Sequence, residues 1–379
     1  MTASRKTDEQ FLRCALELAR QGIGLTSPNP CVGALLVNSK GKVVGSGTHT
    51  YDGVKHAEIL ALEQAGKKAR GATLYINLEP CCHQGRTAPC VDAVIAAGVR
   101  RVVACMQDPN PQVKGRGFAK LRAARIEVTK GLLEADAQLL NEAFTKYVQH
   151  HTPFITLKAA MTLDGKIAPP TNSNAKGAHA TWITSETARA HVQELRHQND
   201  AILVGVGTVI ADDPLLTDRS GRPRRRPLLR VILDSRLRLP LDSRVVKTAQ
   251  DDLLVLCSFA EEKKKRQLQR RGIRVEQISP PTAEGHPDLP AVVRHLGQEE
   301  ITSVMIEGGA IVNWAALDSK IVDKVFLYYA PKILGGGNSV PLAAGAGFHA
   351  IGDAAQIHSI RLHRFGEDFA VEGYLKCSH

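Results

Sequence analysis

His56-Ala57-Glu58, followed downstream by Pro80-Cys81 and then by Cys90, is the stretch that determines the expected fold and chemistry. One imidazole and two thiols are ligands that zinc binds tetrahedrally, and a catalytic zinc site keeps the fourth position open for water. Zinc lowers the pKa of its bound water to about 7, which provides hydroxide at neutral pH. Glu58 is not needed as a ligand, so its carboxylate is available to transfer protons between this water and a leaving group. The spacing therefore predicts a catalytic zinc site.

The local sequence predicts where these residues lie. Residues 73–78 are rich in β-branched and apolar side chains, which is typical of a buried strand. Residues 90–97 are bounded by a proline and a glycine and have helical apolar spacing. A second helix begins at His56, so both His56 and Cys90 are expected at helix N-termini. Because the helix dipole stabilises a thiolate there, we expect Cys90 to deprotonate readily.

The second sulfur ligand has alternatives. A Cys-x-x-Cys spacing would place it at Gln84, which cannot supply a thiolate. Cys82 directly follows Cys81, so their side chains diverge, and His83 is a further possible ligand. We favour Cys90 because a helix start suits a thiolate ligand. The competing interpretation is a set of buried reduced thiols beside a core histidine. The complete set, with a nearby glutamate as general acid/base, is typical of zinc-dependent nucleobase deaminases.

Composition limits the class of protein. The 379 residues suffice for two domains, and 43% hydrophobic with 23% charged residues indicates a soluble globular chain. The polar start predicts no signal peptide, and no apolar run is long enough for a membrane span. Eight cysteines over this length predict metal ligands and spare thiols in a reducing cytoplasm.

The net charge of +11 suits either nucleic acid or small phosphorylated ligands. The densest basic runs, 222–226 and 263–266, contain no aromatic residues, and aromatic content is only 4%. Base stacking needs such rings, so we interpret the runs as a solvated loop and a charged helix face. We expect no nucleic acid and no membrane among the partners.

Two α/β domains are expected, over residues 1–149 and 150–379. The first combines a hairpin across 38–41 with strands and helices in one compact sheet. Its last helix is expected over 132–147. The second alternates strands with helices, which favours a largely parallel sheet with ligands at the strand ends. Its expected strands are 155–157, 201–204, 228–233, 253–256, 304–306 and 324–329, and its clearest helices 185–198 and 289–296. Residues 168–181 are expected to form a mobile loop.

Two glycine turns follow strands in the second domain, at 204–208 and 304–309. A strand, a glycine turn and a helix N-terminus form a cradle of backbone amides that binds phosphate. Neither turn matches the dinucleotide fingerprint or the Walker loop. Tight turns need glycine whatever their function, so each is weak alone, but two in one domain favour ligand binding.

Short motifs are spread over both halves of the chain. Those of the N-terminal half are Asn29-Pro30, Val32-Gly33-Ala34, His56-Ala57-Glu58, the run from Glu79 to Cys90 and Asp108-Pro109-Asn110-Pro111. Those of the C-terminal half are Leu157-Lys158, Leu163-Asp164-Gly165-Lys166, Trp182-Ile183-Thr184-Ser185, Val204-Gly205-Val206-Gly207-Thr208, Ala211-Asp212-Asp213-Pro214, Glu307-Gly308-Gly309 and Ala330-Pro331-Lys332. Through these motifs the chain resembles the bifunctional riboflavin-biosynthesis deaminase/reductase family over nearly its whole length. The long Cys81 to Cys90 spacing is the form found in this family.

The resemblance implies a cytidine-deaminase-like fold followed by a dihydrofolate-reductase-like fold, with zinc and NADPH as cofactors. The first domain would deaminate 2,5-diamino-6-(5-phosphoribosylamino)pyrimidin-4(3H)-one, a small phosphorylated pyrimidine. The second would reduce the ribosyl side chain with NADPH to give 5-amino-6-(5-phosphoribitylamino)uracil. A homo-oligomer is also expected.

Residue by residue, the family places zinc on His56, Cys81 and Cys90, with Glu58 as the catalytic acid/base. The implied substrate-binding residues are Asn29, His83, Thr87, Lys158, Ala180, Arg196, Leu216, Arg219 and Glu307. The implied cofactor-binding residues are Ala160, Trp182, Thr208, Asp212, Ser235, Gly309, Ala310, Ile311, Val312, Asn313, Trp314 and Ala315. Lys158 and Glu307 are the candidates for the reductase proton donor. This sequence departs from the family at a longer loop before Trp182, where Ala180 replaces the usual serine.

Three other functions compete with this one. A tRNA adenosine deaminase would share His-Ala-Glu but would have Cys-x-x-Cys and a single domain. A non-enzymatic protein with structural zinc would close the site with a fourth ligand, such as Cys82 or His83. A chain with one working domain would catalyse only one of the two steps.

Overall fold

The computed structural model describes residues 2–170 and 182–376 and divides into two compact units. The first comprises Met1–His151 with Pro223–Arg226, and the second Thr152–Arg222 with Pro227–His379. The predicted loop 168–181 lies almost entirely outside the described residues, and so does Ala180. None of the helices in the described ranges could span a bilayer. Cysteines 14, 31, 81, 82, 90, 105 and 257 are all free thiols.

The first unit is built on one five-stranded sheet in the order β2-β1-β3-β4-β5. β1 pairs antiparallel with β2 and β3, whereas β3, β4 and β5 run parallel. The strands are β1 (Gly33–Val37), β2 (Val43–Thr48), β3 (Thr73–Leu78), β4 (Arg101–Met106) and β5 (Glu127–Lys130). The helices are α1 (Thr2–Arg20), α2 (Ala57–Ala65), η1 (Gly66–Ala69), α3 (Cys90–Ala96), α4 (Arg116–Ala123), α5 (Glu134–Leu140) and α6 (Glu142–His150). The predicted hairpin, the 73–78 strand and both helix starts near the metal motif are confirmed.

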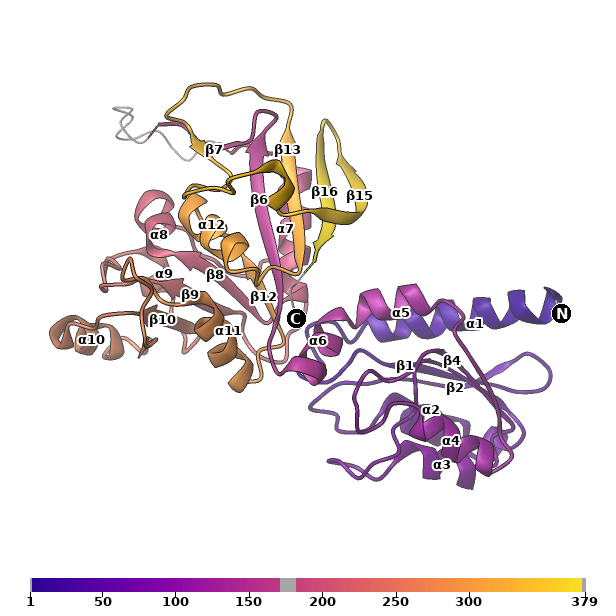
Figure 1. Cartoon of the computed structure of the whole chain (residues 1–379). Coiled ribbons are helices and arrows are strands. Elements are labelled where there is room, and N and C mark those ends of the chain that lie inside the picture. The colour runs from indigo at the N-terminus through magenta and orange to yellow at the C-terminus, as the bar shows by residue number, and fades with distance from the viewer. Residues whose placement is uncertain (1, 171–181, 377–379) are drawn as a thin grey trace. The chain divides into compact units, whose positions relative to one another are not determined.

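Helices cover both faces of this sheet. Figure 1 shows α1 and α5 on one side and α2, α3 and α4 on the other. The buried core between them is almost wholly aliphatic, from Leu12 and Leu16 of α1 to Val91 and Val94 of α3. The two helices that begin at the metal motif therefore pack side by side against the same sheet.

The single helix predicted over 132–147 is wrong. The structure has two helices, α5 and α6, which break at Asn141. Both polar groups of the Asn141 side chain bond to the backbone of Cys31: Cys31 N donates to Oδ1 at 2.8 Å, and Nδ2 donates to the Cys31 carbonyl at 3.1 Å. These long-range bonds fix Asn141 in a non-helical conformation, which local helix propensity cannot reveal.

The second unit contains a nine-stranded sheet in the order β11-β10-β9-β8-β12-β6-β13-β16-β15. The first seven strands run parallel, as predicted, and β16 and β15 are antiparallel additions. The strands are β6 (Phe154–Thr162), β8 (Ala201–Gly205), β9 (Leu229–Leu233), β10 (Leu253–Cys257), β11 (Arg274–Gln277), β12 (Ser303–Ile306), β13 (Lys324–Ala330), β15 (Ile357–Phe365) and β16 (Asp368–Leu375). A separate pair is formed by β7 (Lys166–Ala168) and β14 (Val340–Pro341).

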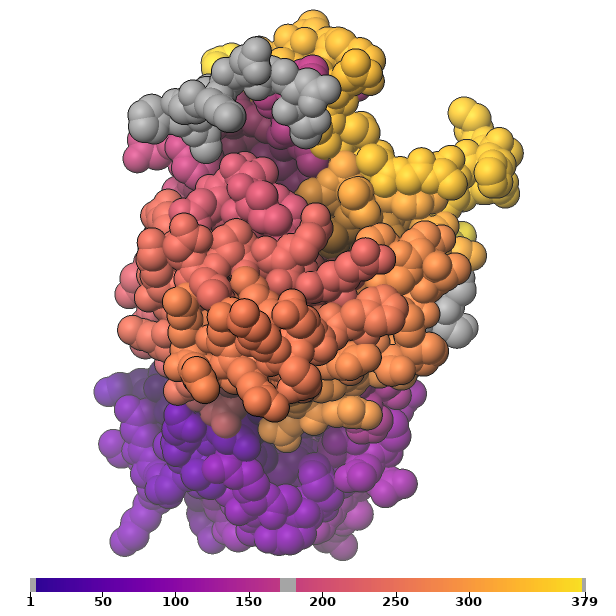
Figure 2. Space-filling model, turned by 90° about the vertical axis from the view of Figure 1, so that its left-hand side faces the viewer, coloured from indigo at the N-terminus to yellow at the C-terminus, as the bar shows by residue number. Residues whose placement is uncertain are grey.

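Helices also cover both faces of the second sheet. They are α7 (Glu186–Gln198), α8 (Val206–Asp212), α9 (Arg244–Lys247), α10 (Glu262–Gln269), α11 (Leu289–Gln298), α12 (Ala310–Asp318) and the short η2 (Ile351–Asp353). The apolar residues of α11 and α12 pack with Leu157, Leu203 and Val325. Those of α8, α9 and α10 pack with Ile202 and Val204 on the opposite face, where α7 covers β13. In Figure 2 the yellow C-terminal segments stand out from the pink and orange body of this unit.

The two basic runs differ in structure. Residues 263–266 lie in α10 and form the predicted charged helix face. The run 222–226 is not simply solvated, because Arg225 packs 3.5 Å from the ring centroid of Tyr51 and donates to the Ser27 carbonyl at 2.6 Å.

Candidate functional site

The structure brings His56, Cys81 and Cys90 together in the first unit. The Nδ1 atom of His56 lies 3.1 Å from the Cys90 sulfur and 3.5 Å from the Cys81 sulfur. All three ligand atoms lie within 4.8 Å of one another. His56 is the N-cap of α2 and Cys90 is the first residue of α3, so two adjacent helix starts supply two of the three ligands. This donor set fits zinc.

Cys81 lies just after the end of β3, and the nearby Glu79 anchors this part of the backbone. The buried Glu79 carboxylate accepts hydrogen bonds from the backbone amides of Asp108, Gly115 and Phe118. These contacts tie the end of the strand to the start of α4. The backbone that carries Cys81 is therefore anchored before the less regular 82–89 segment begins.

The acidity of the two thiols differs from the prediction that Cys90 deprotonates readily. The side-chain hydrogen bond from Cys90 lowers the pKa of Cys81 to about 4, with His56 adding to the effect. That same hydrogen bond, together with burial and the nearby Glu58, raises the pKa of Cys90. The helix start at Cys90 is right, but its backbone amide donates to the Cys81 sulfur at 3.3 Å and so stabilises the neighbouring thiolate.

Glu58 lies in the first turn of α2 beside the three ligands and is only 3% exposed. Burial and the charge of Cys81 raise the pKa of Glu58 to about 7. A carboxyl with a pKa near neutrality both accepts and releases protons, as a general acid/base must. Among the described residues, neither Cys82 nor His83 belongs to the ligand cluster. The geometry therefore does not supply the fourth protein ligand that a structural zinc site would require.

His49, which was not predicted from the sequence, contacts both Asn29 and the metal-motif residue His56. Asn29 Nδ2 lies 3.0 Å from His49 Nε2, and the His49 and His56 rings pack edge to face with centroids 5.2 Å apart. His49 Nδ1 contacts the Lys55 carbonyl at 3.0 Å, and burial lowers the pKa of His49. A lone histidine just after a β-hairpin carries no motif, so only the fold reveals its place.

The other two predicted residues of the deaminase site lie on the 82–89 segment. His83 is half-buried, and its Nδ1 atom is enclosed without a hydrogen-bond partner in the described structure. Thr87 is also half-buried, and its carbonyl accepts from the Gly85 amide at 3.2 Å. Of the described hydrogen bonds, none joins the Thr87 side chain to Asn29 or His56.

The two glycine turns of the second unit lie side by side, because β8 and β12 are neighbours in the sheet. A Cβ atom on Gly309 would lie 3.4 Å from the Thr208 hydroxyl, and one on Gly205 would lie 2.9 Å from a Val312 methyl. Gly309 is the N-cap of α12, and Asn313 on this helix has a fully buried, unpaired Oδ1. Glycines at these two crowded positions, beside a helix N-terminus, fit the phosphates of a dinucleotide.

The remaining predicted cofactor residues surround this edge of the sheet. Ala160 lies on β6, next to β12, and Ser235 follows the end of β9 with its hydroxyl 2.8 Å from His286 Nδ1. Asp212 ends α8. Trp182 is 62% exposed and stacks with Arg189, whose guanidinium carbon is 4.8 Å from a ring centroid. Ala310, Ile311, Val312, Asn313, Trp314 and Ala315 form the first two turns of α12.

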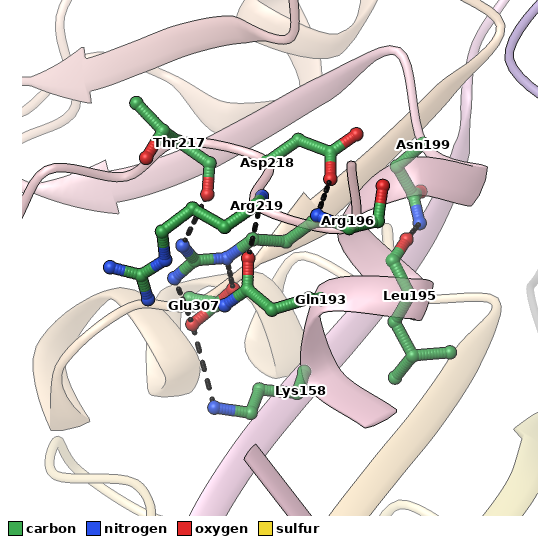
Figure 3. Close-up of polar contacts among 10 residues, drawn as sticks. Lys158, Gln193, Leu195, Arg196, Asn199, Thr217, Asp218, Arg219 and Glu307 are labelled. Carbon is green, nitrogen blue, oxygen red and sulfur yellow. Dashed lines mark hydrogen bonds and ion pairs between the residues drawn. The ribbon is translucent and has the colours of Figure 1, made fainter. Parts of the chain in front are cut away.

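Lys158, Arg196 and Glu307 form one buried ionic network, which Figure 3 shows. Arg196 Nε and Nη2 donate to the two Glu307 oxygens at 2.7 and 3.1 Å, and Lys158 Nζ lies 3.4 Å from Oε2. Burial alone would raise the pKa of Glu307, but the charges of Lys158 and Arg196 lower it to about 2. Glu307 is therefore ionised at neutral pH.

The predicted substrate residues Leu216 and Arg219 lie on the segment between α8 and β9. Leu216 is buried and has φ of 57°, which is unusual for a non-glycine residue. The preceding carbonyl, of Leu215, accepts from the fully buried Arg230 at 3.1 Å. Arg219 is exposed. The residue before it, Asp218, pairs with His197 of α7.

Comparisons with known proteins match both halves of the chain. Residues 5–106 match the cytidine and deoxycytidylate deaminase zinc-binding region, and residues 153–371 match the RibD C-terminal domain. The chain is 40% identical over 366 residues to riboflavin biosynthesis protein RibD of Actinobacillus pleuropneumoniae, covering 97% of this chain and 95% of that protein. The chain belongs to the RibD family. Its fold is therefore a cytidine-deaminase-like domain followed by a RibD reductase domain, as predicted.

Two solved RibD structures extend the comparison to three dimensions. Acinetobacter baumannii RibD superposes with a TM-score of 0.85 at 34% identity, covering 98% of this chain and 99% of that one. The second is the diaminohydroxyphosphoribosylaminopyrimidine deaminase/5-amino-6-(5-phosphoribosylamino)uracil reductase of Thermotoga maritima. It superposes with a TM-score of 0.83 at 35% identity, covering 98% of this chain and 100% of that one.

Membership of the RibD family confirms the predicted resemblance, the bifunctional deaminase/reductase activity in riboflavin biosynthesis, and zinc and NADPH as cofactors. A tRNA adenosine deaminase is excluded by the full-length match.

Proposed function

We propose that residues 1–149 hydrolyse the amino group of 2,5-diamino-6-(5-phosphoribosylamino)pyrimidin-4(3H)-one. Residues 150–379 then reduce the ribosyl group of the product with NADPH to give 5-amino-6-(5-phosphoribitylamino)uracil. The observation that carries this proposal is the cluster of His56, Cys81 and Cys90 with buried Glu58 beside it. The activity of the Thermotoga maritima relative, which matches this chain over its whole length, supports the substrate assignment.

In the deaminase site, zinc would be held by His56, Cys81 and Cys90, and when bound it supplies a water that is acidic enough to attack at neutral pH. The Glu58 carboxylate would carry a proton from the attacking water to the departing ammonia. Asn29 holds the edge of the pyrimidine, and His49 positions the Asn29 amide through their 3.0 Å contact. His83 and Thr87 line the substrate from the 82–89 segment.

In the reductase site, NADPH would be held by the two glycine turns and by Ala160, Trp182, Asp212 and Ser235, and it supplies a hydride. Reduction to the ribityl group also needs one proton. Glu307 is ionised at neutral pH and has no proton to give, which leaves Lys158 as the donor of the two predicted candidates. Arg196, Leu216 and Arg219 contact the substrate, and the two guanidinium groups suit its phosphate.

We further propose a cytoplasmic enzyme that forms a homo-oligomer and binds no nucleic acid. The seven free thiols of the described residues support a reducing compartment. Light scattering of the purified protein measures the oligomeric state.

The decisive experiment assays the two reactions separately with the diaminopyrimidine phosphate. Ammonia should be released without NADPH, and cofactor oxidation should begin only when NADPH is added to the deaminated product. A zinc chelator should stop ammonia release and leave reduction of the deaminated product unchanged. If the chelator stopped both reactions, or neither, the assignment of deamination to the first domain and reduction to the second would be contradicted.

Substituting Gly308 with alanine should weaken cofactor binding. The added Cβ would lie 2.7 Å from Val312 Cβ, so the first turn of α12 must shift. We expect the Kd for NADP⁺ to rise about tenfold, which corresponds to about 1.4 kcal/mol. Isothermal calorimetry measures this Kd. Gly352→Ala is the matched control, because a Cβ there has no atom within 4 Å, and an unchanged Kd in G308A would show that this turn does not bind the cofactor.

A further inference from the structure

One face of α7 contacts three consecutive residues, 217–219, of the segment that carries Arg219. Gln193, Arg196 and His197 are spaced three and four residues apart, so they lie on the same side of the helix. Figure 3 shows how Gln193 and Arg196 reach toward residues 217–219. The segment is thereby attached to a rigid element of the reductase domain.

Each attachment is a specific hydrogen bond. Gln193 Oε1 accepts from the Arg219 amide at 3.0 Å, and Arg196 Nη1 donates to the Thr217 carbonyl at 2.9 Å. His197 Nδ1 lies 2.9 Å from Asp218 Oδ2, with side-chain exposures of only 2% and 7%. The second Asp218 oxygen accepts from the Ser220 amide at 2.9 Å. The backbone on both sides of Arg219 is therefore fixed.

The Arg219 guanidinium itself points away from these contacts. In Figure 3 it lies beside Arg196, and no hydrogen bond or ion pair is drawn to it. Arg196 pairs directly with Glu307 at 2.7 Å, whereas Glu307 acts on Arg219 through its charge, with no ion pair to Arg219 among the described residues. A fixed backbone that presents a guanidinium with no direct carboxylate partner in the described structure is suited to binding an anion bidentately.

We propose that Gln193, His197 and Asp218 are positioning residues that hold Arg219 against the phosphate of the substrate and so set the preference for a phosphorylated substrate. This inference rests on the proposed reductase function. Ordering the segment before binding removes an entropic cost that a loose arginine would incur with each substrate molecule. The three positioning residues contribute to binding only through Arg219, so their effect should depend on the phosphate.

The test compares the deaminated substrate with its form that lacks the phosphate. The ratio of the two reductase kcat/KM values measures the phosphate contribution, and calorimetry of the phosphorylated and unphosphorylated products gives the same ratio in Kd. Gln193→Leu should lower the ratio about tenfold, chiefly through KM, and Asp218→Asn should act in the same direction. Gln193→Glu retains the acceptor oxygen, so its kcat/KM ratio should stay close to that of the unmodified enzyme.

Arg222→Ala is the matched control, because Arg222 is exposed, lies in the same segment and pairs with the half-buried Glu194 of α7. The ratio of kcat/KM for the phosphorylated substrate to kcat/KM for the unphosphorylated one should be the same in R222A as in the unmodified enzyme. If Gln193→Leu lowers kcat/KM equally for both substrates, Gln193 only supports the fold and the inference is overturned. If the unmodified enzyme does not reduce the phosphorylated pyrimidine at all, the proposed function fails and the inference with it.

Discussion

Replacing Glu58 with glutamine should reduce ammonia release by about 10³-fold, within the range expected for losing a general acid/base. Glutamine is close in shape to glutamate but cannot accept and return a proton. Because the predicted ligands are His56, Cys81 and Cys90, the variant should retain zinc. The reductase domain should be unaffected, so the deaminated product should still be reduced at the normal rate.

Three measurements check this prediction: ammonia release, zinc content by elemental analysis, and NADPH oxidation with the deaminated product. Glu63→Gln is the matched control, since Glu63 is an exposed carboxylate on the same helix and pairs with Lys55 at 2.7 Å. It should retain ammonia release within about twofold. Full deaminase activity in E58Q would show that another group moves the proton, and loss of zinc would show that Glu58 supports the metal site.

The metal cluster could be predicted from the sequence because it depends on the chemistry of a few side chains and on short stretches of neighbouring residues. Few side chains bind zinc, and the helices that begin at His56 and Cys90 could be identified from their own residues. The strand that ends before Cys81 was equally clear from its run of apolar residues. Three local elements packed on one sheet were then sufficient to bring the ligands together.

Features that depend on distant residues could not be predicted in this way. The break at Asn141 is caused by hydrogen bonds to Cys31, 110 residues earlier. His49 matters through Asn29 and His56, and no motif surrounds it. The high pKa of Cys90 reflects its partner Cys81, whereas the prediction considered only the helix dipole. The strand β15 was missed because most of its side chains are exposed and do not alternate.

The reductase site shows both situations. The glycine turns at 204–208 and 304–309 were visible in the sequence, but their adjacency follows from the order of β8 and β12 in the sheet. The pairing of Arg196 with Glu307 joins a helix to a strand end 111 residues away. Only the fold shows that this carboxylate is buried between two cations.

Replacing Glu307 with glutamine should cause the largest loss in the reductase domain. The substitution removes the carboxylate charge that pairs with the buried Arg196 and Lys158, and breaking a buried pair costs about 3–5 kcal/mol. We expect reductase kcat/KM to fall by about 10²-fold or more and the denaturation midpoint of this domain to fall with it. Ammonia release should change by less than about twofold. Glu194→Gln removes a half-buried carboxylate of α7 that pairs with the exposed Arg222, and it should change neither reductase kcat/KM nor the denaturation midpoint appreciably.

The pH dependence of stability provides an independent check. The pKa of Glu307 is lowered from 4.5 to about 2 in the folded chain, so its stabilisation is fully present above the unfolded value. The difference of about 2.5 pKa units corresponds to about 3 kcal/mol at neutral pH. This contribution is lost as the pH falls from about 4.5 toward 2. Urea titrations at pH 7 and pH 3 measure the free energy of unfolding of the unmodified enzyme and of E307Q. The difference between the two proteins should be smaller at pH 3 than at pH 7. A difference that stays constant would mean that the Glu307 charge does not stabilise the folded domain.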